Sequence, residues 1–134
     1  MVAIFAHALW RGECPRMFGH GRPTRDYIHV ADVVEAMIQG TGTRGTFNVA
    51  TGIETSVRQL YSVLAAAAES SIEPELLPLR EGELERSCMD PSHANEVLGW
   101  RARIPISDGL TETYRELVCE FEERERAGPR PGEG

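Results

Sequence analysis

The sequence predicts an α/β fold, and three observations lead to that prediction. Apolar residues recur at helical spacing in several segments, short runs rich in β-forming residues stand between them, and glycine or proline marks the joins. The chain has 134 residues, of which 41% are hydrophobic, and this is ordinary for one globular domain. The predicted order is helix, strand, strand, helix, strand, helix, strand, helix, helix, and such alternation is typical of α/β proteins.

The first predicted element is a helix over residues 2–11, with Val2, Phe5 and Leu9 on one stripe. This helix has no residue to cap its amino end, because Met1 directly precedes the first apolar position. Native domains usually begin with a cap or a polar lead-in. We therefore expect further residues upstream of Met1.

Two strands and a second helix are predicted next. Residues 16–18 form a short strand, and residues 19–26 form a loop rich in glycine and proline. Residues 27–30 are predicted to be a buried strand, residues 31–39 a helix, and residues 46–50 the third strand. Glycines between residues 40 and 45 separate this helix from the third strand.

Capping residues place the remaining helices. Ser56 and Gln59 fit a capping box, and apolar residues at helical spacing continue from there toward Ala68. Residues 73–80 are predicted to be extended. The pair Asp90-Pro91 is typical of a helix start.

The helix that starts after Asp90 is predicted to end at Gly99, with Trp100 packing back against it. Ser107 is predicted to cap the last helix, whose apolar stripe runs to Phe121. The structured region is therefore expected to span residues 1–121. Residues 122–134, which are rich in Glu, Arg, Gly and Pro, are expected to form a disordered tail.

Composition excludes several classes of function. All 14 basic residues are arginine and none is lysine, so the chain has no P-loop lysine, no Schiff-base lysine and no Tyr-x-x-x-Lys pair. A net charge of −7 argues against nucleic-acid binding. No apolar run approaches the 18 residues of a membrane span, and no signal peptide is evident, so a cytoplasmic protein without membrane contact is expected. The three cysteines, Cys14, Cys88 and Cys119, are predicted to be reduced and partly buried thiols.

The segment from Phe18 to Asp32 is the most informative part of the chain. A glycine-rich loop leads to Arg25 and Asp26 at a strand entrance. The planar guanidinium of an arginine suits phosphate oxygens, and Asp26 either orients that group or caps a nearby turn. The alternative is a tight turn with a surface ion pair. His29, within the apolar run, is predicted to be a hydrogen-bonded core histidine.

A second arginine meets a glycine turn in Arg80-Glu81-Gly82-Glu83. Two separated arginines that face one cleft would suit a diphosphate, while the alternative for this segment is a solvated charged loop. Arg86 is a weaker candidate of the same kind. Asn48 and Thr51 either present ligand groups at the end of a strand or stabilise a turn.

The ordered motifs resemble one family. Gly19-x-Gly21-x-x-x-Arg25-Asp26-Tyr27-Ile28-His29-Val30-x-Asp32 closely resembles the carboxyl-terminal half of extended short-chain dehydrogenases, the NAD-dependent nucleotide-sugar epimerases and dehydratases. UDP-glucose 4-epimerases are the most similar in pattern. The resemblance continues through residues 45–52, 80–83, 90–92 and 98–100, and it covers about residues 2–121.

The resemblance implies an α/β substrate-binding region and a set of site residues. The backbone around Met17 and Phe18 would hold the base of a UDP- or dTDP-sugar, and Arg25 and Arg80 would bind its diphosphate. Glu83 stands where these epimerases carry aspartate, which bears on a contact to the ribose.

Other departures from the family concern glycines and cofactor chemistry. Ala50 replaces a family glycine. The family's glycine-rich NAD loop and its Tyr-x-x-x-Lys pair do not occur in this sequence, whose tyrosines are followed four residues later by Ala31, Ala65 and Val118. NAD is therefore expected as the cofactor of the full-length family, with none bound by this chain alone and no Rossmann core in it.

Three interpretations of function follow. The first is the substrate-binding half of an epimerase of the UDP-glucose 4-epimerase type, which acts with a Rossmann half in the same chain or in trans. The second is a non-catalytic module that binds a nucleotide sugar. The third is a truncated remnant without independent function.

Overall fold

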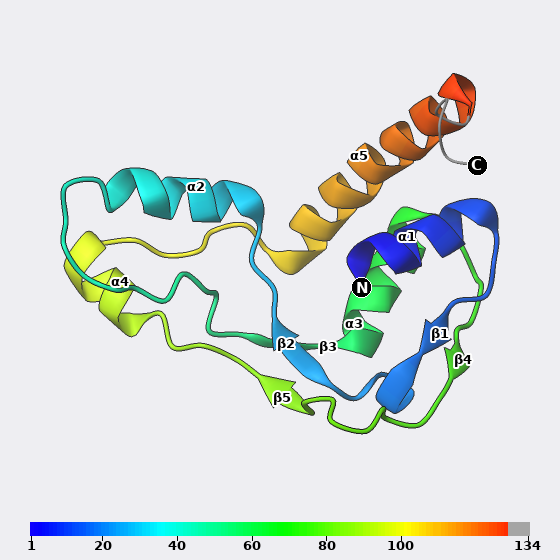
Figure 1. The fold of residues 1–134 in the computed structure, drawn as a ribbon, viewed down its shortest axis with the longest axis horizontal. Coiled ribbons are helices and arrows are strands. Elements are labelled where there is room, and N and C mark those ends of the chain that lie inside the picture. Colours follow the sequence, from blue (N-terminus) through cyan, green and yellow to red (C-terminus); the bar gives the residue numbers. More distant parts are fainter. Residues whose placement is uncertain (129–134) are drawn as a thin grey trace.

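Three helices form the larger hydrophobic core of the molecule. The computed structural model describes residues 1–128, and in it α1 (Val2–Arg11), α3 (Val57–Ala67) and α5 (Ile106–Ala127) pack against one another (Figure 1). The buried members of this core are Phe5, Ala6, Leu9, Met17, Val57, Leu60, Tyr61, Leu64, Leu110 and Tyr114. The rings of Phe5 and Tyr61 meet edge to face at 5.3 Å, and such pairs add to the gain from apolar burial.

A smaller core lies between α2 (Val30–Gln39) and α4 (Ser92–Leu98), on the far side of the strands from the three-helix core (Figure 1). Ala36 of α2, Ala94 of α4 and Trp100 are its buried members. The indole nitrogen of Trp100 donates a hydrogen bond to the carbonyl oxygen of Asp32 at 3.1 Å. The predicted packing of Trp100 is therefore confirmed.

The structure has two small sheets, of which the three-stranded one lies between the two cores (Figure 1). The first pairs β1 (Arg16–Met17) with β4 (Glu75–Leu76) in parallel. The second places β2 (Thr24–Asp26) between β3 (Glu54–Ser56), which is antiparallel to it, and β5 (Arg86–Ser87), which is parallel. With parallel strands and helices alternating along the chain, the predicted α/β class is confirmed.

The strand predictions were correct in part. The strand predicted at residues 16–18 ends at Met17, and a 3-10 turn, η1 (Phe18–Gly21), follows it. The strand predicted at residues 27–30 is wrong, because β2 ends at Asp26 and the chain enters α2 at Val30. The strand predicted at residues 46–50 pairs with no strand of the described part of the chain, and β3 was not predicted.

The predicted capping residues mark most helix ends correctly, but the starts of α4 and α5 differ from the prediction. Ser56 and Gln59 form the predicted capping box, and Gly99 ends α4 in the left-handed conformation, at φ 67°. Asp90 Oδ1 accepts a hydrogen bond from the backbone of Ser92 at 2.9 Å, and α4 begins at Ser92, after Pro91. Ser107 does not cap α5, which begins one residue earlier; its hydroxyl donates to Asp108 instead.

Two further expectations differ from the structure. Cys14, Cys88 and Cys119 are free, as predicted, but all three are exposed. Helix α5 continues through Ala127, beyond the boundary expected at Phe121, and residues 129–134 of the expected tail lie outside the described residues. Among the helices of residues 1–128, none combines the length and apolar character that a membrane span requires.

Candidate functional site

The 3-10 turn at residues 18–21 is built from unusual backbone conformations. Gly19, His20 and Gly21 all have positive φ, at 61°, 55° and 75°. A positive φ is uncommon for a residue with a side chain, so His20 is held there by its surroundings. His20 donates its backbone N–H to the carbonyl oxygen of Leu77 at 3.1 Å, which supplies one such restraint.

Both glycines of this turn are required by space as well as by φ. A Cβ atom at Gly19 would lie 2.7 Å from the ring of Pro23. A Cβ atom at Gly21 would press against the sulfur of Met17 and the side chain of Arg58. The turn is therefore packed on both sides, and it fixes the position of Phe18.

Hydrogen bonds through Leu77 join this turn to a distant segment. The backbone N–H of Leu77 donates to the carbonyl oxygen of Met17 at 2.9 Å, and its carbonyl accepts from His20. Met17 itself is fully buried in the larger core. The backbone around Met17 and Phe18 is thus held against residues 77–80, although the two segments are far apart in the sequence.

This arrangement brings Phe18 and Arg80 together. The guanidinium carbon of Arg80 lies 3.6 Å from the centre of the Phe18 ring, which is cation–π stacking. A guanidinium that stacks through its face keeps its N–H donors in the plane of the group, directed outward at its edge. Arg80 is exposed, so these donors are suited to an anionic ligand.

Glu83 is close to this pair through a tight turn. Its backbone N–H donates to the carbonyl oxygen of Arg80 at 3.2 Å, with Gly82 at φ 78° between them. The Oε2 atom of Glu83 is buried and has no hydrogen-bond partner among the described residues. A buried acceptor without a donor is costly, so this oxygen is an energetically unfavourable feature of the turn.

The structure does not bring Arg25 to this pair. Arg25 lies on β2, where its guanidinium donates to the carbonyl oxygen of its neighbour Thr24 at 2.7 Å. Within residues 1–128, no hydrogen bond, ion pair or ring stacking joins Arg25 to Phe18 or Arg80. Direct contacts therefore do not link Arg25 to Arg80, and their shared cleft stays a prediction.

Asp26 caps a turn, which settles one alternative from the sequence. Its carboxylate accepts hydrogen bonds from the backbone and hydroxyl of Thr51, at 3.0 and 2.6 Å, and from the backbone of Gly52 at 2.8 Å. Partial burial raises the pKa of Asp26, but the bonds from Thr51 and Gly52 outweigh it and hold the pKa below 3.8. Asp26 orients these residues and not Arg25.

Asn48 and Thr51 likewise have structural partners. The side-chain amide of Asn48 donates to the carbonyl oxygen of Asp90 at 3.1 Å, and Thr51 is bound to Asp26. Partial desolvation by neighbouring atoms and the adjacent carboxylate of Asp26 raise the pKa of the exposed Cys88 thiol, so this thiol is a poor nucleophile at neutral pH. The structure therefore agrees with the alternative in which Asn48 and Thr51 stabilise a turn.

A cavity of about 290 Å³ lies next to the glycine turn. Its lining includes Gly19 and Leu79, the neighbours of Phe18 and Arg80, together with Arg22 and Arg86. Arg86 pairs with Glu54, and hydrogen bonds from Arg86 and Thr24 lower the pKa of Glu54 to about 2. Sequence reasoning assigned no role to Arg22, although its position between Gly21 and Pro23 places it on the same loop.

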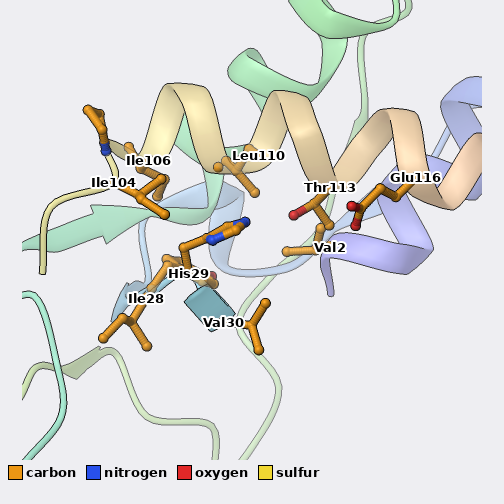
Figure 2. A pocket seen from close by; sticks show the side chains of 12 residues that line it. Val2, Ile28, His29, Val30, Ile104, Ile106, Leu110, Thr113 and Glu116 are labelled. Carbon is orange, nitrogen blue, oxygen red and sulfur yellow. The ribbon is translucent and has the colours of Figure 1, made fainter. Parts of the chain in front are cut away.

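The sequence predicted a hydrogen-bonded His29 but did not show what His29 and Asp32 bind. His29 Nδ1 accepts a hydrogen bond from the backbone of Ala31 at 3.3 Å and so caps α2. Its imidazole points toward α5, at the edge of a separate cavity of about 350 Å³ (Figure 2). Asp32 is buried and accepts from the backbone N–H groups of Arg103 and Ile104, at 3.1 and 3.0 Å. Within residues 1–128, no cluster of His, Cys, Asp and Glu has the composition of a metal site.

Comparison with known proteins places the chain. Residues 2–113 match the sequence model of the family described as GDP-mannose 4,6 dehydratase. The chain belongs to the epimerase and dehydratase family of extended short-chain dehydrogenases. It is 44% identical over 116 residues to UDP-glucose 4-epimerase of Mycolicibacterium smegmatis, a match that covers 84% of this chain and 37% of the relative. The predicted family is thereby confirmed.

Solved structures of the family agree in fold. UDP-glucose 4-epimerase of Thermotoga maritima, solved with UDP-glucose, is 35% identical, with a TM-score of 0.82, over 90% of this chain and 40% of that one. The enzyme of Thermus thermophilus, solved with NAD, is 31% identical, with a TM-score of 0.76, over 87% of this chain and 39% of that one. This family member therefore spans less than half the length of these relatives.

The residues present do not fit NAD. The one run with G-x-G-x-x-G spacing, at Gly40, Gly42 and Gly45, follows α2 and leads into residues 46–53, which form no helix. The glycine-rich turn at residues 18–21 leads into β2 and not into a helix. A dinucleotide site requires such a turn at a helix amino end, where backbone N–H groups meet the pyrophosphate.

Proposed function

We propose that this chain is the substrate-binding part of an NAD-dependent nucleotide-sugar epimerase of the UDP-glucose 4-epimerase type. The observation that supports this most directly is the stacked pair of Phe18 and Arg80, with Glu83 beside it. A rigid turn presents the aromatic ring, the arginine stacks on that ring, and Glu83 follows the arginine in a tight backbone turn. A UDP-sugar, or a dTDP-sugar, offers a base, a diphosphate and hydroxyl groups that match these three features.

Each residue then has a proposed contact. The backbone around Met17 and Phe18 holds the base, since buried Met17 and the bonds to Leu77 fix that backbone. Arg80 binds diphosphate oxygens through the edge of its guanidinium. To reach the diphosphate, Arg25 breaks its hydrogen bond to the carbonyl oxygen of Thr24. This change requires only a movement of the arginine side chain. Glu83 Oε2 accepts a hydrogen bond from a ligand hydroxyl.

The chemistry of epimerisation is proposed to require residues outside this chain's span. The sequence contains no lysine and no dinucleotide turn, so this chain binds no NAD and catalyses no epimerisation alone. A nucleotide-binding half, in the same polypeptide or in trans, would supply NAD, whose chemistry when bound is reversible hydride transfer. This chain's residues hold the nucleotide and so position its sugar.

A non-catalytic binding module is the second proposal. It is favoured by the fact that Phe18, Arg80 and Glu83 are brought together by contacts within this chain. The third interpretation, a remnant without function, predicts no specific binding at this site.

Thermal unfolding of the purified chain with UDP-glucose, UDP or dTDP tests the proposal. A ligand at a hundred times its Kd stabilises the folded chain by about 2.7 kcal/mol, which raises Tm by several degrees. We expect this rise with at least one nucleotide, and its loss in Arg80→Gln.

Arg124→Gln is the matched control, because Arg124 is an exposed arginine on α5 whose ion pair within residues 1–128 is with Glu120, one turn away. This variant should keep the response to the nucleotide. A cooperative transition that no nucleotide shifts would contradict both binding proposals and favour the remnant.

A further inference from the structure

Three aromatic rings gather at the surface where α1 meets α5. The ring centre of Phe121, on α5, is 5.0 Å from that of His7 and 5.3 Å from that of Trp10, both on α1. The rings of His7 and Trp10 are 5.6 Å apart. Trp10 and Phe121 are half-buried and His7 is exposed, so these three residues, which we name the aromatic cluster, have an open side.

A cavity of about 450 Å³ lies at this open side. Helix α1 contributes His7 and Trp10 to its lining. The end of α5 contributes residues at positions i, i+3, i+4 and i+7, which share one face of the helix: Phe121, Arg124, Glu125 and Gly128. The cavity is therefore a groove between the carboxyl-terminal halves of two helices, and Gly128 lies in its lining.

An ion pair holds the two walls of the groove together. Arg11 Nη1 donates to Glu125 Oε1 at 2.8 Å, and Arg11 Nε lies 3.4 Å from Glu13 Oε1. The guanidinium carbon of Arg11 also lies 5.9 Å from the centre of the Trp10 ring. The last turn of α5 is thus tied to the end of α1, and the shape of the groove is set before anything enters it.

The chain leaves α5 at this groove. Gly128 ends the helix with φ 69° and ψ 178°, a conformation open almost only to glycine. Its backbone N–H donates to the carbonyl oxygen of Glu125 at 3.3 Å, which holds it at the helix end. The next residues in the sequence are Pro129, Arg130 and Pro131. Proline cannot continue a helix and favours the extended polyproline II conformation.

We propose that the segment Pro129-Arg130-Pro131 docks on the aromatic cluster of its own chain. Proline-rich segments bind grooves lined by aromatic rings, and a polyproline II segment loses little conformational entropy when it binds. With three residues per turn, Pro129 and Pro131 take up two of the three sides of such a segment, and Arg130 takes the third. Three residues at about 3.1 Å each span about 9 Å. This length is enough to cover ring spacings of 5.0 and 5.3 Å.

The position of Gly128 favours this occupant over a separate protein. Gly128 lines the groove and directly precedes Pro129, so no linker has to be spanned and the effective concentration of the segment is about millimolar or higher. A separate partner would also lose translational and rotational freedom on binding. The docked segment covers Trp10 and adds contacts between the ends of α1 and α5. The inference does not depend on the proposed function.

Quenching of tryptophan fluorescence by acrylamide tests the proposal on the complete chain. Trp100 is 1% exposed, so the quencher reaches mainly Trp10. In the double variant Pro129→Ser/Pro131→Ser, we expect the quenching constant to rise at least about twofold, because Trp10 loses its cover. Gly132→Ser is the matched control, since it places the same amino acid next to the docked segment, and it should leave the constant unchanged.

Nuclear Overhauser contacts provide a second measurement, made on the parent chain. We expect contacts between ring protons of Pro129 or Pro131 and indole protons of Trp10, and we expect them to be unchanged on dilution. Thermal unfolding shows whether the double variant is folded. If it is not, the contacts in the parent decide.

Two results would overturn the proposal. Absence of these contacts in the parent, with Trp10 quenched as readily as in the double variant, would mean that the segment leaves the groove open. Contacts that disappear on dilution, together with sedimentation as a dimer, would place the segment of a second copy in the groove. Neither result bears on the proposed function, which the nucleotide-dependent rise in Tm tests separately.

Discussion

Asp32 provides the sharpest test of how this fold is held together. Its carboxylate is buried at the amino end of α2, and it accepts the backbone N–H groups of Arg103 and Ile104. Its own carbonyl accepts the Trp100 indole. One residue thus fixes the segment that runs from α4 to α5, and we expect Asp32→Ala to be strongly destabilising.

The magnitude follows from the two hydrogen bonds that the carboxylate accepts. A hydrogen bond to a charged group contributes about 1.5–3 kcal/mol, so losing both costs about 3–6 kcal/mol. Water can reach the partly buried N–H groups, which favours the lower part of that range. Asp32→Asn keeps one acceptor oxygen and should lose about half as much. Native proteins have a free energy of unfolding of about 5–15 kcal/mol, so Asp32→Ala removes a large share of it.

Urea denaturation followed by tryptophan fluorescence measures this loss, because buried Trp100 reports on the affected segment. Glu35→Gln is the matched control one turn along α2. Its pair with Arg103, at 3.3 Å, is largely exposed on the arginine side and should contribute no more than about 1 kcal/mol. If Asp32→Ala and Glu35→Gln had the same free energy of unfolding, the reasoning would be refuted.

Three further predictions concern the glycine turn, a helix cap and one carboxylate. Gly12→Ala should lower the free energy of unfolding by about 1–2 kcal/mol, because Gly12 has φ 70° but has open space around it. Gly19→Ala should lower it by at least about 1 kcal/mol more, because the added methyl group would also clash with Pro23. Equal losses for the two variants in urea denaturation would contradict this. Ser56→Ala should lower the free energy of unfolding by about 0.5–2 kcal/mol and lower the Tm measured by far-UV circular dichroism. An unchanged Tm would mean that the capping box does not stabilise the fold. The pKa of Glu54 is lowered from 4.5 to about 2, so its stabilisation is complete above pH 4.5 and is lost as the pH falls through 2. The stability difference between the parent and Glu54→Gln should therefore shrink over that window, and a difference that is constant with pH would count against the assigned pair.

Helices were predictable because their signals are local. Apolar residues at 3.6-residue spacing and a cap such as Ser56 or Gly99 lie within the element they define. The start of α2 was displaced because His29, which caps it, is outside the usual set of capping residues. Ser107 looked like a cap for α5, but the helix already begins at Ile106.

Strands were less predictable because each is only two or three residues long. A segment such as Thr24–Asp26 is too short to show alternation, and it carries charged side chains where a buried strand would be apolar. Its strand character comes from pairing with β3 and β5, which are distant in sequence. Pairing of that kind is decided by the tertiary fold and leaves little trace in a local window.

In the candidate site, too, single residues could be predicted from the sequence, but the contacts between them could not. Spacing singled out Arg25 and Arg80 separately, but it gave no sign that Arg80 would stack on Phe18, because β1 and β4 bring those segments together. The resemblance to a family places Phe18, Arg25 and Arg80 in one site. Asp26 and Thr51 were noticed as polar residues next to a strand, and the structure assigns them to a turn.

The strand predicted at residues 46–50 fails for a related reason. The run carries β-branched and aromatic residues, but within residues 1–128 it pairs with no strand. Phe47 and Val49 are only partly buried, where they pack against the smaller core. Strand propensity does not form a sheet without a neighbouring strand, because the backbone N–H and C=O groups then gain no partner. The amide protons of residues 46–50 should therefore exchange rapidly in the chain alone, and slow exchange there would contradict this assignment.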